Sequence, residues 1–422
     1  MLRRFSRRSF VKESAVAGVA VLADASKAGA VPGAEHPPRI EQFWPVPPTP
    51  TPAVVGMPPQ PYRTAIGWAG GTFTYDEARA CLKHHGADLG ALDQDLTLKD
   101  AHYSFSHFDE AVIDPQRYQL SIGGNVSKPM TLGLADLQAR PNVTETVLLE
   151  CAGNGRAALD PRPRYIPTPW FQEAFGVARY VGTPLASLLG EAGIGPGSVE
   201  VVFSGADHGV EQLISHNYQR SLIIADALDP EVLVAWEANG EPLTQAHGAP
   251  VRLVVPHWYG MASVKWLVGI EVVTKPFRGF QQYRSYRYTD SDPFRDPGLP
   301  VQRINVRAAM KPPGVADVDT AARWLPAGPT TLVGKAWSGH GRIVRVEVST
   351  NGGETWRDAA LGVPVSSQSW TPWSFPWYAA KGNYVVAVRA TDSAGHRQPM
   401  HPRWNYLGVG INAIELSRVI VT

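Results

Sequence analysis

Cysteine is scarce in this chain, since only two of its 422 residues, Cys81 and Cys151, carry a thiol. An excess of one charge is also lacking, because 39 Lys and Arg residues nearly balance 38 Asp and Glu residues and leave a net charge of +1. This balance argues against nucleic acid or an anionic membrane as the main partner. Long hydrophobic runs are missing as well: no stretch reaches the roughly 18 apolar residues of a membrane-spanning helix, so we expect no membrane anchor.

Proline, glycine and tryptophan are, by contrast, abundant. The chain holds 37 Pro, 40 Gly and 13 Trp residues, which favour a loop-rich, β-rich fold over a helical one. With 44% hydrophobic residues, the chain is long enough for two domains that each bury a core.

The amino terminus has the pattern of an export signal. Arg7 and Arg8 precede the apolar stretch 14–22, and small residues at 28–30 offer a cleavage site. We therefore predict a twin-arginine signal peptide over 1–30 and a periplasmic protein. This pathway exports folded proteins, commonly because a cofactor is inserted beforehand. Residues 31–95 are then predicted to form a Pro-rich arm and a short region with a helix at 74–83.

Cys151 follows the apolar, β-branched run 146–149, which predicts a buried strand that ends at the thiol. Residues 153–155 are Gly, Asn and Gly, which tolerate positive φ and let backbone N–H groups surround an anionic or metal-bound group. Arg156 adds a positive charge that is expected to lower the pKa of the thiol and to receive an anionic substrate. We therefore predict that Cys151 is a metal ligand.

Two other interpretations of Cys151 stay open on the sequence alone. It could be a buried structural cysteine, because free cysteine is among the most buried residue types. It could also form a disulfide with Cys81. An oxidising compartment permits that disulfide, whereas a metal inserted before export would already occupy the thiol.

The body of the chain, 96–295, mixes short strands with short helices. Strands are predicted at 118–122, 146–149, 199–203, 232–236, 251–255 and 269–273. Helices are predicted at 134–139 and at 183–192, the second closed by Gly193. Because the two kinds of element alternate irregularly, we predict an α+β domain rather than a doubly wound sheet.

From about residue 300 the sequence alternates at period two, at 333–337, 343–349 and 384–390, and Asn351-Gly352-Gly353 supplies a hairpin turn. This pattern predicts an all-β immunoglobulin-like sandwich over 300–422. The cysteine pair typical of that sandwich is absent, so its stability would come from its apolar core.

Five motifs, taken together and in this order, resemble the sulfite oxidase family of molybdenum enzymes. They are 150–156, Trp170, 247–256, 263–267 and 348–356. The resemblance covers about residue 96 to the carboxyl end. It implies a molybdopterin-binding catalytic domain over 96–295 and an immunoglobulin-like dimerisation domain over 300–422, and therefore a homodimer.

The resemblance also implies a cofactor site. Cys151 would bind molybdenum beside the two dithiolene sulfurs of the pterin, as suits a soft thiolate. Arg252 and Lys265 would face the phosphate as cations, whereas His247 by itself would be an ordinary loop histidine. The residues that the resemblance places around the pterin and its phosphate are Tyr103, His107, Asp207, His247, Arg252, Ser263, Val264 and Lys265.

For the substrate pocket, the resemblance aligns Tyr286 with an active-site tyrosine, although an interface tyrosine is the simpler interpretation. Three arginines of the family converge on the anionic substrate. Only Arg156 stands at such a position here, because Phe105 and Leu407 occupy the other two. Losing two charged hydrogen bonds weakens anion binding by roughly 3–6 kcal/mol. Trp170 would line the pocket, although a core position is more usual for a tryptophan.

We therefore predict an exported molybdopterin oxidoreductase that oxidises sulfite, or a related sulfur compound, by oxygen-atom transfer. The chain has no Cys-x-x-Cys-His haem motif, so electrons would leave to a separate carrier such as a periplasmic c-type cytochrome. Two alternatives are kept. Phe105 and Leu407 would suit a larger or neutral substrate such as a sulfoxide, and a cofactor-less periplasmic binding subunit would leave Cys151 without a metal.

Overall fold

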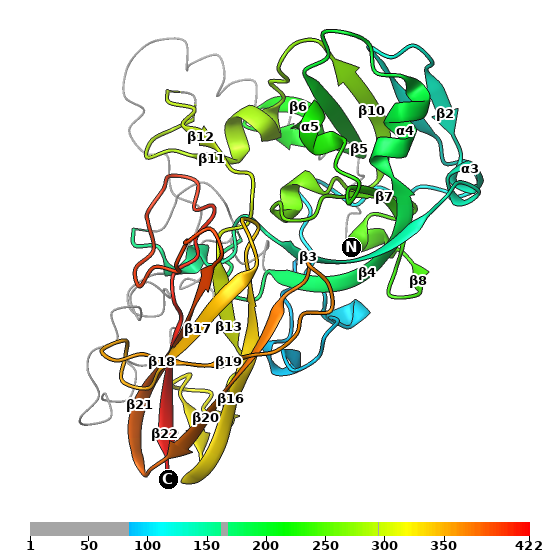
Figure 1. Ribbon diagram of the computed structural model, residues 1–422. Coiled ribbons are helices and arrows are strands. Elements are labelled where there is room, and N and C mark those ends of the chain that lie inside the picture. The colour runs from blue at the N-terminus through cyan, green and yellow to red at the C-terminus, as the bar shows by residue number, and fades with distance from the viewer. Residues whose placement is uncertain (1–83, 162–167, 294) are drawn as a thin grey trace, which may run out of the picture.

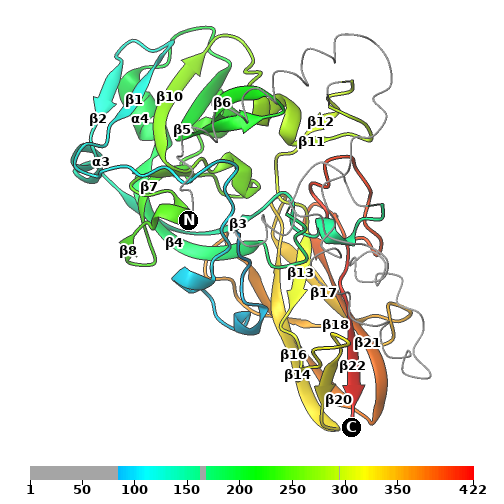
Figure 2. The ribbon, with the colours of Figure 1, turned by 180° about the vertical axis from the view of Figure 1, so that it is seen from behind.

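The computed structural model describes residues 84–161, 168–293 and 295–422. The predicted signal peptide, the predicted Pro-rich arm, the predicted helix at 74–83 and Cys81 lie outside these ranges. Within them, no helix combines the length and the apolar character that crossing a membrane would need. The described chain forms two units, which Figures 1 and 2 show one above the other, with the carboxyl terminus at the far end of the second.

The first unit contains a mixed sheet in the order β2-β1-β10-β5-β6. β1 and β10 run parallel, whereas the other neighbours are antiparallel. Its strands are β1 (Leu120–Gly124), β2 (Met130–Leu132), β5 (Glu200–Glu211), β6 (Ile214–Ile223) and β10 (Leu267–Val273). β5 and β6 form a long hairpin that extends beyond the rest of the sheet (Figure 1).

A second sheet of the first unit has the order β3-β4-β7-β8, and β9 pairs with β7. Its strands are β3 (Val143–Glu150), β4 (Phe175–Pro184), β7 (Leu233–Ala238), β8 (Glu241–Pro242) and β9 (Arg252–Val254). The helices are short: α3 (Leu134–Gln138), α4 (Leu185–Ala192), α5 (Ile224–Ala227) and a π-helical turn at Gln281–Ser285. The ribbon β11 (Arg287–Tyr288) and β12 (Leu299–Pro300) follows.

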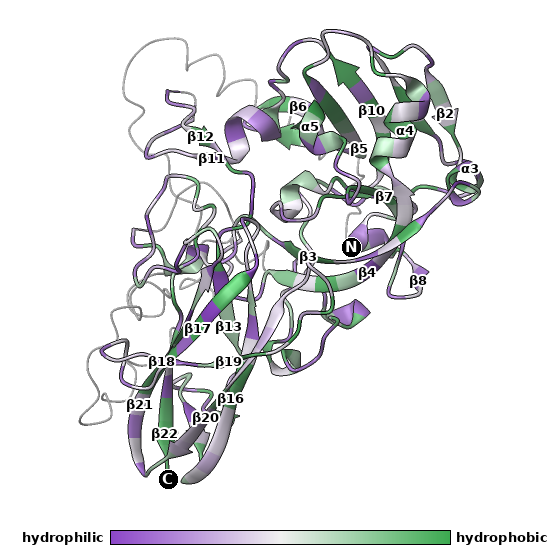
Figure 3. Cartoon of the chain, in the orientation of Figure 1, coloured by the Kyte–Doolittle hydropathy of each residue, from purple (hydrophilic) through white to green (hydrophobic). Residues whose placement is uncertain are grey.

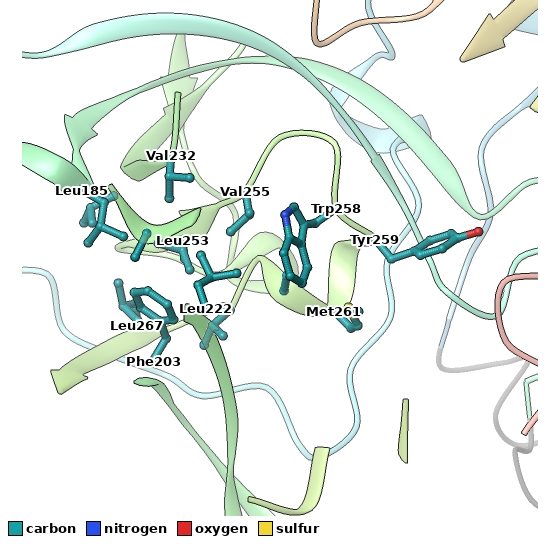
Figure 4. Close-up of a cluster of buried hydrophobic side chains, with 14 of the residues drawn as sticks. Leu185, Phe203, Leu222, Val232, Leu253, Val255, Trp258, Tyr259, Met261 and Leu267 are labelled. Atoms are coloured by element: carbon teal, nitrogen blue, oxygen red, sulfur yellow. The ribbon is translucent and has the colours of Figure 1, made fainter. Parts of the chain in front are cut away.

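The core of the first unit joins residues that are distant in the sequence. Figure 4 shows Leu185 of α4 close to Leu253 of β9, with Phe203 of β5 and Leu267 of β10 beside them. All four side chains are fully buried. Burial of such side chains contributes roughly 1.5–3 kcal/mol each, which fixes the two sheets and the loops between them.

The second unit consists of two sheets that enclose a separate core. The first sheet has the order β13-β16-β20-β19, and the second β14-β15-β22-β21-β17-β18. Buried Val346, Phe375 and Val386 belong to the cluster between them. Figure 3 shows hydrophobic and hydrophilic stretches alternating along these strands, as the period-two pattern predicted. The strands are β13 (Arg307–Met310), β14 (Val315–Ala316), β15 (Arg323–Leu325), β16 (Gly328–Trp337), β17 (Ile343–Ser349), β18 (Arg357–Asp358), β19 (Ala360–Leu361), β20 (Thr371–Ala379), β21 (Gly382–Asp392) and β22 (Leu416–Val421).

The six strands predicted in the first unit each overlap a strand of the structure, and both predicted helices are present. The helix predicted at 183–192 begins at Leu185, because Thr183 and Pro184 are the last residues of β4. Gly193 follows α4 with φ 68°, a left-handed value that favours glycine, and its N–H binds the Leu189 carbonyl.

Residues 84–95, the described end of the short region predicted to follow the arm, contact the second unit. Asp95 lies 3.1 Å from the Lys335 ammonium group, and its carbonyl accepts a 3.1 Å hydrogen bond from the Trp370 indole. Asp93 lies 2.8 Å from the Lys311 ammonium group. Through these ion pairs and this hydrogen bond, the segment contacts the sheet that contains β13 and β16.

Candidate functional site

A pocket opens where β3 ends, beside the segment 102–107 and the loops on either side of β9. Ten of the residues predicted from the sequence line it: Tyr103, Phe105, His107, Cys151, Asp207, His247, Arg252, Ser263, Lys265 and Tyr286. The remaining four, Arg156, Trp170, Val264 and Leu407, are buried but do not belong to its lining. Residues that are far apart in the sequence, from Tyr103 to Tyr286, thus meet around one cavity.

Cys151 directly follows β3, as predicted, and its thiol is free and buried. The Gly153 N–H donates to Sγ at 3.4 Å. Burial raises the pKa of Cys151, although the Arg156 charge and the Gly153 hydrogen bond both act to lower that pKa. The expectation that Arg156 lowers the thiol pKa was therefore right for its own contribution and wrong for the net result, because desolvation outweighs it.

The Arg156 side chain leaves no room for a side chain at position 153. A Cβ atom built on Gly153 would lie 2.0 Å from Nη2 of Arg156, so any larger residue would displace the guanidinium group. Gly155 has φ 83° and begins the 3-10 turn Arg156–Ala158. The Gly-Asn-Gly sequence therefore folds the chain back so that Arg156 lies beneath the Cys151 loop.

Glu150, the last residue of β3, is fully buried and carries the ion pair that sequence reasoning missed. Its Oε1 lies 2.7 Å from Nε of Arg307, and its Oε2 accepts a 2.7 Å hydrogen bond from the Trp337 indole. Asn154 also donates to Oε1 at 2.9 Å. Arg307 and Trp337 belong to β13 and β16 of the second unit and are paired in register, so the second unit holds the residue next to Cys151.

Two cations of the pocket hold its loops together. Arg252 donates to the carbonyls of His247 at 3.0 Å and Ser263 at 3.1 Å. Lys265 donates to the Ser106 hydroxyl at 2.7 Å and to the Ala246 carbonyl at 2.7 Å. Lys265 also donates to the Phe105 carbonyl at 3.0 Å, so both cations are fixed at the pocket wall by neutral acceptors.

Two histidines lie at the same wall. Nδ1 of His247 lies 2.7 Å from the Thr244 hydroxyl, while Nε2 is buried and has no hydrogen-bond partner. Burial and the charges of Arg252 and Lys265 lower the pKa of His247 to about 4. Burial and His247 lower the pKa of His102 to about 3, and its Nε2 also lacks a partner. Both rings are therefore neutral near pH 7 and can accept or donate one further hydrogen bond.

Tyr286 reaches the pocket from the end of the π-helical turn. Its hydroxyl lies 2.7 Å from Nε2 of His107. Burial raises the pKa of Tyr286 well above its ordinary value, so the phenol retains its proton. Arg220 of β6, which no sequence pattern distinguished, is buried with its guanidinium carbon 5.5 Å from the centre of the Tyr286 ring.

The residues predicted to contact substrate lie at different depths. The Phe105 ring lines the pocket, 5.1 Å from the His107 ring. Trp170 clusters with Cys151. Nε of Arg156 donates to the Gly408 carbonyl at 3.2 Å, and Nη1 is buried without a partner. Leu407, predicted to line the pocket, is instead packed in the main core and sits outside the lining.

Comparisons with known proteins define the class. The chain matches the oxidoreductase molybdopterin binding domain over residues 107–281 and the Mo-co oxidoreductase dimerisation domain over 300–420. It is 32% identical to the sulfite oxidase of Gallus gallus over 339 residues, which cover 74% of this chain and 71% of that protein. The chain therefore belongs to the sulfite oxidase family of molybdopterin-dependent oxidoreductases.

Other relatives differ in length and name. Mitochondrial sulfite oxidase of Homo sapiens is 32% identical over 346 residues, which cover 78% of this chain and only 62% of the human protein. An NADH nitrate reductase of Ulva prolifera is 28% identical over 347 residues, 76% of this chain and 40% of that protein. The solved sulfane dehydrogenase SoxCD of Paracoccus pantotrophus is similar with a TM-score of 0.67 and 25% identity, covering 94% of this chain and 96% of that one.

The residues of the pocket fit the cofactor that the family implies. The unpartnered Nε2 atom of His247 and two cations face a space that can hold an anionic group. Among the described residues, no group of three or more His, Cys, Asp and Glu side chains gathers to hold a metal. In the cofactor that the family implies, a dithiolene would supply sulfur ligands to a metal held by Cys151.

Proposed function

We propose that this protein is an exported, homodimeric molybdopterin oxidoreductase that transfers an oxygen atom to sulfite or a related sulfur compound and passes electrons to an external c-type cytochrome. Its catalytic unit would span 96–295 and its immunoglobulin-like dimerisation unit 300–422. The observation that carries the proposal is the free Cys151 thiol in a pocket whose wall also contains Arg252 and Lys265. The twin-arginine pattern at residues 7–8 supports export.

Each pocket residue has a distinct task in this proposal. Cys151 would hold the metal, and because its pKa is raised, metal binding must displace the thiol proton. Arg252, Lys265 and Ser263 would receive the phosphate, and neutral His247 would offer Nε2 to the pterin. When bound, the cofactor supplies oxygen-atom transfer and takes up two electrons.

The residues around the thiol would bind and orient the substrate. Arg156 lies outside the pocket lining, and its unpartnered Nη1 would place a positive charge behind the Cys151 loop that favours an anionic substrate. The Tyr286 phenol, which lines the pocket and keeps its proton, would offer a hydrogen-bond donor. The pocket thus provides fewer positive charges to the substrate than the three arginines that the family resemblance implies for sulfite.

A second candidate substrate is a larger or less charged sulfur compound, such as a sulfane or a sulfoxide. The observation that favours it is the Phe105 ring, which lines the pocket at one of the arginine positions. The similar solved protein is itself named a sulfane dehydrogenase, which supports this candidate.

The proposed function is tested by isolating the full chain from a host that makes molybdopterin. We expect stoichiometric molybdenum and pterin, and turnover of sulfite, a sulfane donor or a sulfoxide with an artificial electron carrier or cytochrome c. Protein that is folded, as judged by circular dichroism, and free of molybdenum would overturn the proposal and favour the cofactor-less binding subunit.

Replacing Phe105 with arginine should restore one charged donor to the pocket. A hydrogen bond to a charged group contributes about 1.5–3 kcal/mol, so the KM for sulfite should fall by about 10- to 100-fold. The KM for a neutral sulfoxide should rise or stay constant. Steady-state kinetics measure both values, and Phe105→Leu controls for the loss of the ring. An unchanged KM for sulfite in Phe105→Arg would show that residue 105 does not face the substrate.

A further inference from the structure

A chain of polar groups leads from the pocket to the surface at the tip of the β5–β6 hairpin. It begins at the Tyr286 hydroxyl, which lines the pocket and lies 2.7 Å from Nε2 of His107. Nδ1 of His107 in turn lies 3.5 Å from Oε2 of Glu211, the last residue of β5. The two ring nitrogens of one histidine therefore join the pocket phenol to a carboxylate.

Glu211 is held in place from the π-helical turn that precedes Tyr286. The Ser285 hydroxyl donates to Oε1 at 3.2 Å, and the buried Gln281 amide donates to Oε2 at 3.1 Å. The side chain of Glu211 is 20% exposed, whereas Tyr286 is 5% exposed. The carboxylate thus meets solvent while the phenol does not. π-Helical turns are frequent at functional sites, and this one positions both ends of the chain.

The electrostatics set a direction for proton movement. Burial acts to raise the pKa of Glu211, but the hydrogen bonds and charge from His107 and the Ser285 hydroxyl outweigh it, so the net pKa is lowered. Tyr286 keeps its proton because burial raises its pKa. The other groups that face these two residues are His216, beside Gln281, and the group of Tyr218, Arg220 and Cys151 around Tyr286. A protonated donor therefore stands at the pocket and an ionised acceptor at the surface.

We infer that Tyr286, His107 and Glu211 form a relay that carries protons from the pocket to solvent during turnover. The inference rests on the proposed function, since oxidation of a substrate with water as the oxygen source releases two protons and two electrons. A proton from the pocket reaches the Tyr286 oxygen as the phenol proton passes to Nε2 of His107. The proton on Nδ1 moves to Glu211, which releases it to water. His107 is then left with its proton on Nε2, and a change of tautomer through water, or a flip of the ring, returns a proton to Nδ1 before the next transfer.

The relay is tested with Glu211→Gln in the holoenzyme, because glutamine keeps the size and loses the proton-accepting charge. In dilute buffer we expect kcat to fall by about 100-fold, the low end of general acid–base effects. Imidazole at high concentration should restore kcat by accepting protons in place of the carboxylate. The wild-type kcat should stay flat below neutral pH, because Glu211 remains ionised there, while the variant should gain activity as pH and buffer base rise.

Glu231→Gln is the matched control. Glu231 lies 3.6 Å from Nε2 of His257, so it belongs to a similar histidine–glutamate pair, but it lies outside the pocket lining. Its kcat and buffer dependence should match those of the wild type. A Glu211→Gln kcat within twofold of the wild type in dilute buffer, or a loss that imidazole does not restore, would overturn the relay.

A readout without turnover separates this inference from the proposed function. In protein labelled with ¹⁵N-histidine, His107 should carry its proton on Nδ1 in the wild type, facing Glu211, and this preference should weaken in Glu211→Gln. A wild type that shows this tautomer but turns over no sulfur substrate would refute the proposed function only. A proton on Nε2 in the wild type would refute the relay only.

Discussion

Replacing Cys151 with serine should abolish turnover while leaving the protein folded. Serine keeps the size of the side chain and its place beside the Gly153 N–H, but its hydroxyl is a hard, weakly acidic ligand where a soft thiolate suits the metal. Loss of a group that merely supports a ligand costs about 10- to 100-fold, so losing the ligand itself should cost at least about 100-fold. Steady-state assays and metal analysis of the same preparation measure the effect.

Cys81→Ser is the control for this experiment, since it removes the other thiol of the chain. We expect it to keep wild-type activity and molybdenum content. Wild-type turnover in Cys151→Ser would contradict the assignment of Cys151 as the metal ligand. Loss of activity in both variants, together with a shift in gel mobility on reduction of the wild type, would instead favour the disulfide between them.

Arg307→Met should destabilise the protein by about 3–5 kcal/mol, because it leaves the Glu150 carboxylate buried without its cation. Both side chains of this pair are at most 1% exposed. Methionine fills a similar volume, so most of the loss comes from charge rather than from a cavity. Denaturant unfolding of the cofactor-free protein, monitored by tryptophan fluorescence, measures the free energy.

Two further variants show whether the effect belongs to the buried pair. Lys128→Met removes the cation of an exposed pair, 3.4 Å from Glu191, and should cost less than about 1 kcal/mol. Arg307→Lys keeps the charge but not the planar guanidinium that also binds the Gln172 side chain and the Ile411 carbonyl, so an intermediate loss is expected. Equal stability of Arg307→Met and the wild type would show that the buried pair contributes nothing to the free energy of unfolding.

Local sequence patterns predicted only part of the fold. The strand at 146–149 was evident because its apolar, β-branched residues face a buried layer on both sides. β20 was missed because Pro372 and Pro376 interrupt its alternation, although its position in the sheet tolerates both. β6 was missed because its first half is polar and solvent-facing. The parallel pairing of β1 with β10 joins residues far apart in the chain, and no local pattern reports such a contact.

The residues of the candidate site also fall into those that the sequence predicted and those that it did not. Residues in contiguous motifs, such as Cys151, Arg252 and Lys265, were predicted through the family resemblance, and the structure gathers them around one pocket. Glu211 and Arg307 were missed, because a single charged residue in a strand has no signature until the pairing of that strand is known. One signal was available: Glu150 closes an apolar run, and a carboxylate at such a place needs a buried cation.

The contacts of Arg307 (β13) and Trp337 (β16) with Glu150 limit which second units can replace this one through recombination. A second unit taken from another protein would have to bring both a guanidinium group and an indole to the same two places, or the thiol-bearing loop would begin at an unneutralised carboxylate. The seam between the units is therefore no neutral crossover point, and the second unit is inherited together with the Cys151 loop that it supports.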